Sequence, residues 1–190
     1  MDELAAKLTV IFENVNDWLK YAEAKNAVLL AFSGAGLTAN VTLLAAAQNL
    51  FGSLRLGLIA STSLLCIGAL ICTLSFLPKV NLEKIFWVRS NPSRRLTSQT
   101  NDDDNFYYFG HLKKYSPDEL LDALDRLYLN GRVQPPFSKE CKDLAAQVAV
   151  NSEIAFLKFQ LFTYALYFLI SSIAIIPLII FLKLLIWKNL

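Results

Sequence analysis

A polar segment between two strongly apolar stretches holds the side chains best suited to chemistry. Residues 105–121 read "NFYYFGHLKKYSPDELL" and contain four successive aromatic residues, a glycine, the only histidine of the chain and two lysines. Arginine and lysine pair with phosphate, and aromatic rings stack on nucleobases. Together with the arginines that precede it, this segment is typical of a binding site for a small nucleotide.

The candidate ligand-binding residues combine these two kinds of group within a short stretch of chain. They are Arg89, Arg94, Arg95, Tyr107, Tyr108, His111 and Lys113. A purely structural interpretation stays open beside this one. In it the aromatic run 106–109 is a buried anchor for neighbouring helices, and the basic side chains only touch anionic lipid.

The chain carries no motif that indicates an enzyme. A Gly-rich phosphate loop, HExxH and GxSxG are missing, and one histidine with three scattered cysteines gives no zinc-ligand spacing. Asp102, Asp103 and Asp104 offer carboxylates from a single loop, whereas a metal site draws ligands from more than one segment. We therefore expect no catalytic residue, no metal site, no cofactor and no enzymatic activity.

Three long uncharged stretches predict a membrane protein. Residues 26–54, 56–78 and 159–182 contain no charged side chain, and about 20 apolar helical residues suffice to cross a bilayer. The whole chain is 55% hydrophobic, with a mean hydropathy of +0.41. The sequence predicts an all-α membrane protein with spans near residues 29–50, 56–78 and 160–182. A re-entrant third span, or a hairpin in the cytoplasm, is the alternative.

The basic residues predict the orientation. Lysine and arginine number three in residues 1–26 and twelve in 79–158, whereas Arg55 alone lies between the first two spans. Cytoplasmic segments are enriched in lysine and arginine. We therefore expect a multi-pass protein of the inner membrane with the N-terminus and residues 79–158 in the cytoplasm.

The chain divides by pattern into four segments. Residues 1–26 form an amphipathic helix, which either lies on the membrane surface or runs directly into the first span. Residues 27–78 hold two transmembrane helices, 79–158 a helical cytoplasmic sensor region, and 159–190 the third transmembrane helix and a tail. In the first span Asn40 is a lone amide, which predicts either packing against another span or a subunit contact or pore lining.

Two helices of the sensor region have clear signals. Ser116 and Glu119 have the spacing of a capping box around Pro117, and Gly131 is expected to close that helix. A last helix begins near Ser138 and is expected to continue into the third span, where Pro177 should kink it.

The order of these features resembles the transmembrane effector family of Pycsar, a prokaryotic anti-phage system. The stretch "YAEAKNAVLLAF" (residues 21–32) leads into the first span, and "FYYFGHLKKYSPDELLDAL" (106–124) is the most specific motif. The stretch "KDLAAQVAVNSEIAFLKF" (142–159) then leads into the third span. The resemblance covers most of the chain, but residues 79–104 have no counterpart in it.

The resemblance implies a function. Such an effector senses a cyclic pyrimidine mononucleotide (cCMP or cUMP), made by a partner nucleotide cyclase, and impairs the inner membrane so that the infected cell stops. We expect the lipid bilayer as target, a homo-oligomer, because three spans cannot line a wide channel, and no DNA ligand. Two alternatives stay open: a pore-forming effector of a CRISPR-associated or cyclic-oligonucleotide defence system, triggered by a protein partner or another nucleotide, and a scaffold without a ligand.

Overall fold

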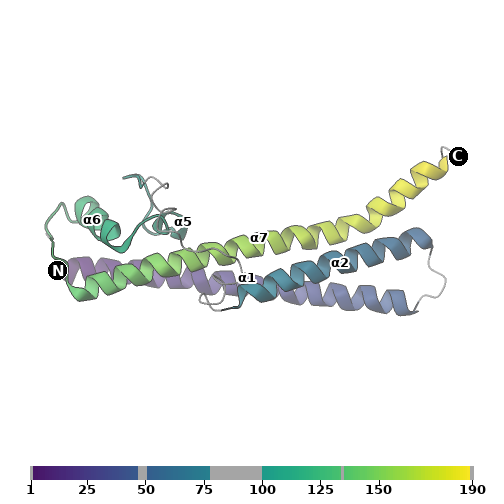
Figure 1. Ribbon diagram of the computed structural model, residues 1–190, viewed down its shortest axis with the longest axis horizontal. Helices are drawn as coiled ribbons and strands as arrows, with labels where there is room; N and C mark the ends of the chain where they lie inside the picture. Colours follow the sequence, from purple (N-terminus) through teal and green to yellow (C-terminus); the bar gives the residue numbers. More distant parts are fainter. Residues whose placement is uncertain (1, 47–50, 78–99, 134, 189–190) are drawn as a thin grey trace. The chain divides into compact units, whose positions relative to one another are not determined.

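The computed structural model describes residues 2–46, 51–77, 100–133 and 135–188. Every regular element in these ranges is a helix, in the order α1 (Asp2–Ala46), α2 (Gly52–Ser75), α5 (Phe109–Leu112), α6 (Pro117–Tyr128) and α7 (Lys139–Lys188) (Figure 1). Helices α1, α2 and α7 are long and apolar enough to cross a membrane. The predicted all-α membrane protein with three spans is thereby confirmed.

The chain forms two compact units. The first, here called the polar unit, comprises Met1–Ala22 and Pro78–Phe159, and the second, the membrane unit, comprises Glu23–Leu77 and Gln160–Leu190. Helices α1 and α7 each begin in the polar unit and continue without a break into the membrane unit. Of the two arrangements expected for residues 1–26, the structure therefore has the one in which this helix runs directly into the first span.

A stripe along α1 forms one side of the core of the polar unit. Leu4, Leu8, Ile11 and Val15 recur every three or four residues, which places them on one face of the helix, and all four are fully buried. They pack against residues from the α5–α6 region and the first part of α7, namely Phe106, Leu112, Leu120, Leu121, Leu124, Ala145 and Val148. This part of α1 is therefore covered by protein.

Helix α6 begins with the capping box that the sequence predicts. The Ser116 hydroxyl accepts a hydrogen bond from the Glu119 backbone N–H, and the Glu119 carboxylate accepts one from the Ser116 N–H. The helix ends at its cap residue Leu129, two positions before the expected Gly131. Asn130 and Gly131 both have positive φ, and the Gly131 N–H donates to the Asp125 carbonyl. The left-handed turn thus occupies two residues and starts earlier than expected.

Glycines set the spacing between helices in the membrane unit. Gly36 of α1 lies against Leu65 of α2, and Gly57 of α2 lies against Ile176 of α7. A Cβ at Gly57 would come within 3.3 Å of the Ile176 Cα, so a larger residue would push the two backbones apart. Small residues allow transmembrane helices to pack closely in this way, which matters because lipid supplies no hydrophobic drive for helix association.

Several polar side chains in the spans form hydrogen bonds within the unit, whereas the buried Ser75 hydroxyl of α2 has no hydrogen-bond partner among the described residues. The hydroxyls that donate to the carbonyl four residues earlier belong to Ser33, Thr38, Thr42, Thr62, Ser63 and Thr73. Asn40 donates from Nδ2 to the Ser61 hydroxyl of α2 at 3.0 Å. Such bonds matter because an unsatisfied polar group in hydrocarbon is costly.

Helix α7 begins one residue after Ser138, whose hydroxyl accepts a hydrogen bond from the Cys141 N–H. Pro177 lies inside this helix. It has no N–H to donate to the carbonyl of Ile173, and the ribbon of α7 bends toward its C-terminal end (Figure 1).

The capping box provides a test of the fold. We expect Ser116→Ala to destabilise α6 by about 1 kcal/mol, because the Glu119 N–H loses its acceptor. Hydrogen–deuterium exchange of the segment 117–124 should accelerate about fivefold. Ser116→Asp, which retains an acceptor, should exchange like the wild type, and equal acceleration in both variants would contradict the role given to the hydroxyl.

Candidate functional site

The aromatic run divides between a buried and an exposed side. Phe106 is 1% exposed and Phe109 is 5% exposed, whereas Tyr108 is 39% exposed. Tyr107 is half-buried, and its backbone carbonyl accepts a hydrogen bond from the Asn14 amide of α1. The run therefore anchors the segment and also presents an aromatic side chain to the surface.

Phe109 lies in an aromatic cluster made by three elements of the polar unit. Its ring stacks on Phe159 of α7 with 5.0 Å between the centroids and 8° between the planes. It also contacts Trp18 of α1 at 5.5 Å, and Tyr21 of α1 contacts Phe159 at 6.2 Å. We call Trp18, Tyr21, Phe109 and Phe159 the aromatic cluster. Through it the short helix α5 touches both helices that continue into the membrane unit.

Gly110 allows the Tyr108 ring to fold back over the turn. A Cβ at position 110 would collide with the Tyr108 ring atoms. The ring can therefore lie beside Phe109, at 4.8 Å, and meet His111 edge-on at 5.2 Å. Glycine at position 110 therefore leaves the space that the Tyr108 ring occupies next to His111. These two predicted site residues are thus brought together.

A buried carboxylate holds the loop in front of α5. Asp104 accepts hydrogen bonds from the Lys114 ammonium at 2.8 Å, the Tyr115 hydroxyl at 3.1 Å and the Asn101 N–H at 3.1 Å. Burial by itself raises the pKa of Asp104. The hydrogen bonds and the charge of Lys114 outweigh it, so the pKa lies below its usual range. Burial, with the bond to Asp104, raises the pKa of Tyr115.

His111 takes part in this loop as a hydrogen-bond acceptor. Its Nδ1 accepts from the Asn105 N–H at 2.8 Å, while the Asp104 carboxylate lies 3.5 Å from the same atom. A nitrogen that accepts from Asn105 carries no proton, so Nδ1 makes no ion pair with Asp104 in this arrangement. The neutral imidazole then bears its proton on Nε2.

Lys113 is directed toward α7. Its ammonium lies 2.9 Å from the centroid of the Phe156 ring. Burial lowers the pKa of Lys113, the nearby Glu153 opposes this by raising it, and Lys114 lowers it further, so that the net direction is downward. A cation over an aromatic face is a stabilising contact, and here it joins the α5 turn to α7.

The remaining predicted site residues lie elsewhere. Arg89, Arg94 and Arg95 fall outside the described residues. Asn40 belongs to the membrane unit, where it contacts Ser61. The chemistry available at the α5 turn within the described part of the chain is therefore aromatic stacking by Tyr108 and hydrogen bonding by His111.

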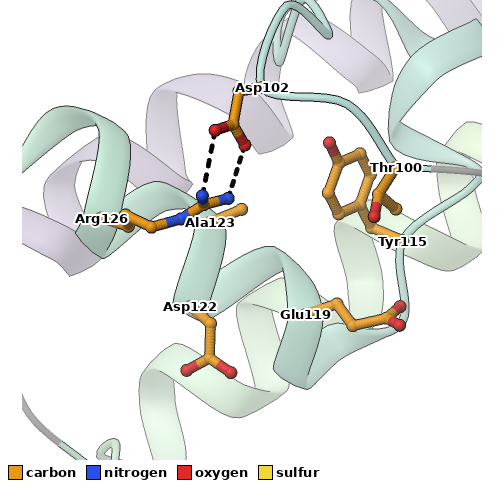
Figure 2. A pocket seen from close by; sticks show the side chains of 7 residues that line it. All are labelled: Thr100, Asp102, Tyr115, Glu119, Asp122, Ala123 and Arg126. Carbon is orange, nitrogen blue, oxygen red and sulfur yellow. Dashed lines mark hydrogen bonds and ion pairs between the residues drawn. The ribbon is translucent and has the colours of Figure 1, made fainter.

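A pocket of about 200 Å³ lies between the loop at residue 100 and α6 (Figure 2). The lining residues are Thr100, Asp102, Tyr115, Glu119, Asp122, Ala123 and Arg126. Figure 2 shows the Arg126 guanidinium facing the Asp102 carboxylate, which accepts two hydrogen bonds from it at 2.6 and 3.0 Å. Three carboxylates against one guanidinium that is already paired make the pocket unfavourable for a phosphate. Within the described residues, no group of His, Cys, Asp or Glu could hold a metal ion.

Sequence reasoning misses Asp104 and the partners of Phe109. In the sequence Asp104 is one of three adjacent loop carboxylates, and only the loop path brings it to Lys114 and Tyr115. Trp18 and Phe159 lie near opposite ends of the chain, so no local pattern links them to Phe109. Trp18 and Tyr21 are aromatic residues close to the start of the first uncharged stretch, where tryptophan and tyrosine are enriched in membrane proteins. They are the one signal that could have pointed to this cluster.

The fold and the site define a class of protein: a three-span helical membrane protein whose polar helical unit holds an aromatic–glycine turn against two of the spanning helices. The family described as Pycsar effector protein domain matches residues 7–185, and the chain belongs to this family. It is also similar to the Pycsar effector protein RsPycTM of a Rhizobium species, with 29% identity over 167 residues, 87% of this chain and 89% of the relative. No solved structure matches the chain.

Family membership confirms the expected resemblance. The protein is an anti-phage defence effector associated with the membrane, and the family is one of cyclic nucleotide signalling.

The Asp104 network predicts a pH dependence. Because the folded-state pKa of Asp104 lies below the unfolded value of about 3.9, its ionised form stabilises the fold above that pH. This contribution disappears as the pH falls through the folded-state pKa. We expect Asp104→Asn to destabilise the polar unit by about 1–3 kcal/mol at pH 7 and to remove part of the acid sensitivity. Thermal unfolding in detergent, followed by fluorescence from pH 3 to 7, measures both effects.

The exposed Asp122 of α6 serves as the matched control. Asp122→Asn should leave the midpoint temperature of thermal unfolding, and its pH dependence, nearly unchanged. Identical pH profiles for wild type and Asp104→Asn would show that Asp104 does not carry the effect.

Proposed function

We propose that this protein is a nucleotide-gated membrane effector. Its polar unit binds a cyclic pyrimidine mononucleotide, cCMP or cUMP, supplied by a partner nucleotide cyclase. Binding leads a homo-oligomer to impair the inner membrane, and the infected cell stops. The protein catalyses no reaction and takes no DNA ligand, and its N-terminus and residues 79–158 lie in the cytoplasm, where the nucleotide is made.

The position of Phe109 is the observation that carries this proposal. The residue belongs to the same short turn as Tyr108 and His111, and it contacts Trp18 of α1 and Phe159 of α7. Both of these helices continue into the spans. A ligand that reorients this turn therefore acts directly on the ends of two membrane helices.

Tyr108 and His111 supply contacts for the nucleobase. Tyr108 is partly exposed and held beside His111 by the Gly110 turn. An aromatic face stacks on a pyrimidine, and the Nε2–H of His111 can donate a hydrogen bond to a base carbonyl. The basic segment with Arg89, Arg94 and Arg95 is the proposed source of phosphate contacts.

The sequence predicts Lys113 as a ligand-binding residue, but in the proposed mechanism its contact with α7 is what matters. With its ammonium over Phe156 and Glu153 nearby, it joins the turn to α7. A phosphate that attracts this ammonium would release that contact. The ligand would then favour an arrangement of α7 different from the resting one, as any switch requires.

Dye leakage from liposomes that contain the purified protein tests the proposed function. We expect cCMP or cUMP to cause leakage, and cAMP and cyclic oligoadenylate to have no effect. Tyr108→Ala should raise the half-maximal nucleotide concentration about tenfold, because stacking of a base on an aromatic ring contributes about 1–3 kcal/mol. Tyr108→Phe retains the ring and should respond like the wild type.

The alternative outcomes separate the competing functions. Leakage with cyclic oligoadenylate alone would assign the chain to another nucleotide system. Leakage with none of these compounds, from protein shown to be folded and inserted, would refute nucleotide gating and favour a protein trigger or a scaffold.

Phe109 provides a separate test of the coupling. Phe109→Leu keeps an apolar side chain in the core but removes the ring contacts with Trp18 and Phe159. Each aromatic pair contributes about 0.5–1.5 kcal/mol. We expect the dissociation constant of Phe109→Leu for the nucleotide to stay within about threefold of the wild-type value. Nucleotide-dependent leakage should fall roughly tenfold.

Phe106→Leu is the matched control, because Phe106 is also buried but its aromatic partners are Tyr115 and Tyr128, whereas Phe109 stacks on Phe159 of α7. It should reduce stability without changing the ratio of leakage to binding. Parallel loss of binding and leakage in Phe109→Leu would mean that this residue does not connect the two.

A further inference from the structure

The membrane unit contains an apolar groove at the end where α2 begins and α7 finishes. It has a volume of about 310 Å³, and its lining residues are Phe51, Ser53, Leu54, Ile180, Lys183 and Leu184. Four of these side chains are apolar, and Lys183 is the one charged group among them. Positive-inside counting assigns this end of the spans to the outer leaflet.

The packing of α2 against α7 explains why a groove opens here. Gly57 brings α2 into close contact with the backbone of α7 at Ile176. Pro177 follows directly and lacks the N–H of a regular helix residue. The C-terminal part of α7 bends away from the start of α2 (Figure 1). The two helices therefore diverge from a tight contact. Because both are long and apolar enough to cross a membrane, the space between them lies at the level of the bilayer.

The sequence places no aspartate or glutamate side chain near Lys183 at this end of the spans. Residues 27–82 and 154–190 contain no aspartate or glutamate. A second copy of the same spans would therefore bring apolar surface and further positive charge, but no acidic side chain at this level. The phosphate of a lipid headgroup is the anion that a bilayer does supply here, and a lysine at the end of a span extends its ammonium toward that layer.

We propose that this groove is a binding site for an anionic phospholipid of the outer leaflet. One acyl chain lies on the apolar wall formed by Leu54, Ile180 and Leu184. The Lys183 ammonium pairs with the headgroup phosphate, and the Ser53 hydroxyl donates to an ester or phosphate oxygen. Ile180, Lys183 and Leu184 are spaced three and four residues apart on α7, so that they share one face of the helix. The assignment of this lipid site does not rest on the proposed nucleotide response.

The lipid preference of the purified full-length protein tests this assignment. Protein equilibrated in detergent with equal amounts of phosphatidylglycerol and phosphatidylcholine is analysed by native mass spectrometry for bound lipid. We expect the wild type to retain phosphatidylglycerol preferentially. Lys183→Gln should reduce the phosphatidylglycerol-to-phosphatidylcholine ratio about fivefold, the effect of one lysine near an anionic lipid surface.

Two further variants keep the test specific. Arg55→Gln makes the same charge change at the same end of the unit but outside the lining residues, and it should keep the wild-type ratio. Leu54→Trp fills the groove and should reduce total bound lipid while Lys183 stays in place. Circular dichroism and the elution volume establish that each variant is folded.

Three results would overturn the proposal. One is a wild type without preference for phosphatidylglycerol. Another is an equal decrease of the phosphatidylglycerol-to-phosphatidylcholine ratio in Lys183→Gln and Arg55→Gln, which would indicate a general effect of surface charge. The third is an oligomer that dissociates in Leu54→Trp with an unchanged lipid ratio, which would show that a second copy of the chain fills the groove.

Discussion

The polar unit depends on one constraint: the apolar stripe of α1 must be buried by protein. Leu4, Leu8, Ile11 and Val15 are fully buried, and each such side chain contributes about 1.5–3 kcal/mol when removed from water. Lipid cannot cover this stripe, because Glu3, Lys7, Glu13 and Asp17 share these turns of the helix. Helix α6 and the first part of α7 supply the cover instead. The capping box and the left-handed turn after Tyr128 define both ends of α6, so that its apolar face keeps this register.

Neighbouring side chains at the α5 turn lie in different environments. Tyr108 precedes α5 with an extended backbone, whereas Phe109 is the first residue of the helix. Phe109 reaches the aromatic cluster while Tyr108 stays partly exposed. Gly110 allows the Tyr108 ring to fold against the turn, and Asp104 holds the preceding loop through Lys114 and Tyr115. In the proposed nucleotide response, a change at the exposed side would reach α1 and α7 through few contacts. Such coupling is reciprocal, so an arrangement of the spans that shifts Phe109 would also change the affinity for the proposed nucleotide.

Local and compositional signals predict much of this fold. The three spans follow from the length of the uncharged stretches. The start of α6 follows from Ser116 and Glu119, because both partners of the capping box lie within four residues of the sequence. The end of α6 is predicted too late, since Asn130 joins Gly131 in the left-handed conformation. The site is less accessible to sequence reasoning. Tyr108 and His111 are sequence neighbours and do meet, but Lys113 packs on Phe156 because the tertiary fold brings α7 to that side of the turn.

The single helix α7 contributes residues both to the aromatic cluster and to the close contact with α2. It carries Phe159 in the aromatic cluster, and it carries Ile176 and Pro177 where α2 packs closely and then diverges. A helix with intact hydrogen bonds transmits a displacement along its axis, whereas a proline removes one bond and lets the segment beyond it bend separately. A lipid held at Lys183 would stabilise one bend of that last segment. By the same linkage that governs any ligand with unequal affinity for two states, the phospholipid composition of the outer leaflet would then bias the equilibrium on which the proposed nucleotide would act.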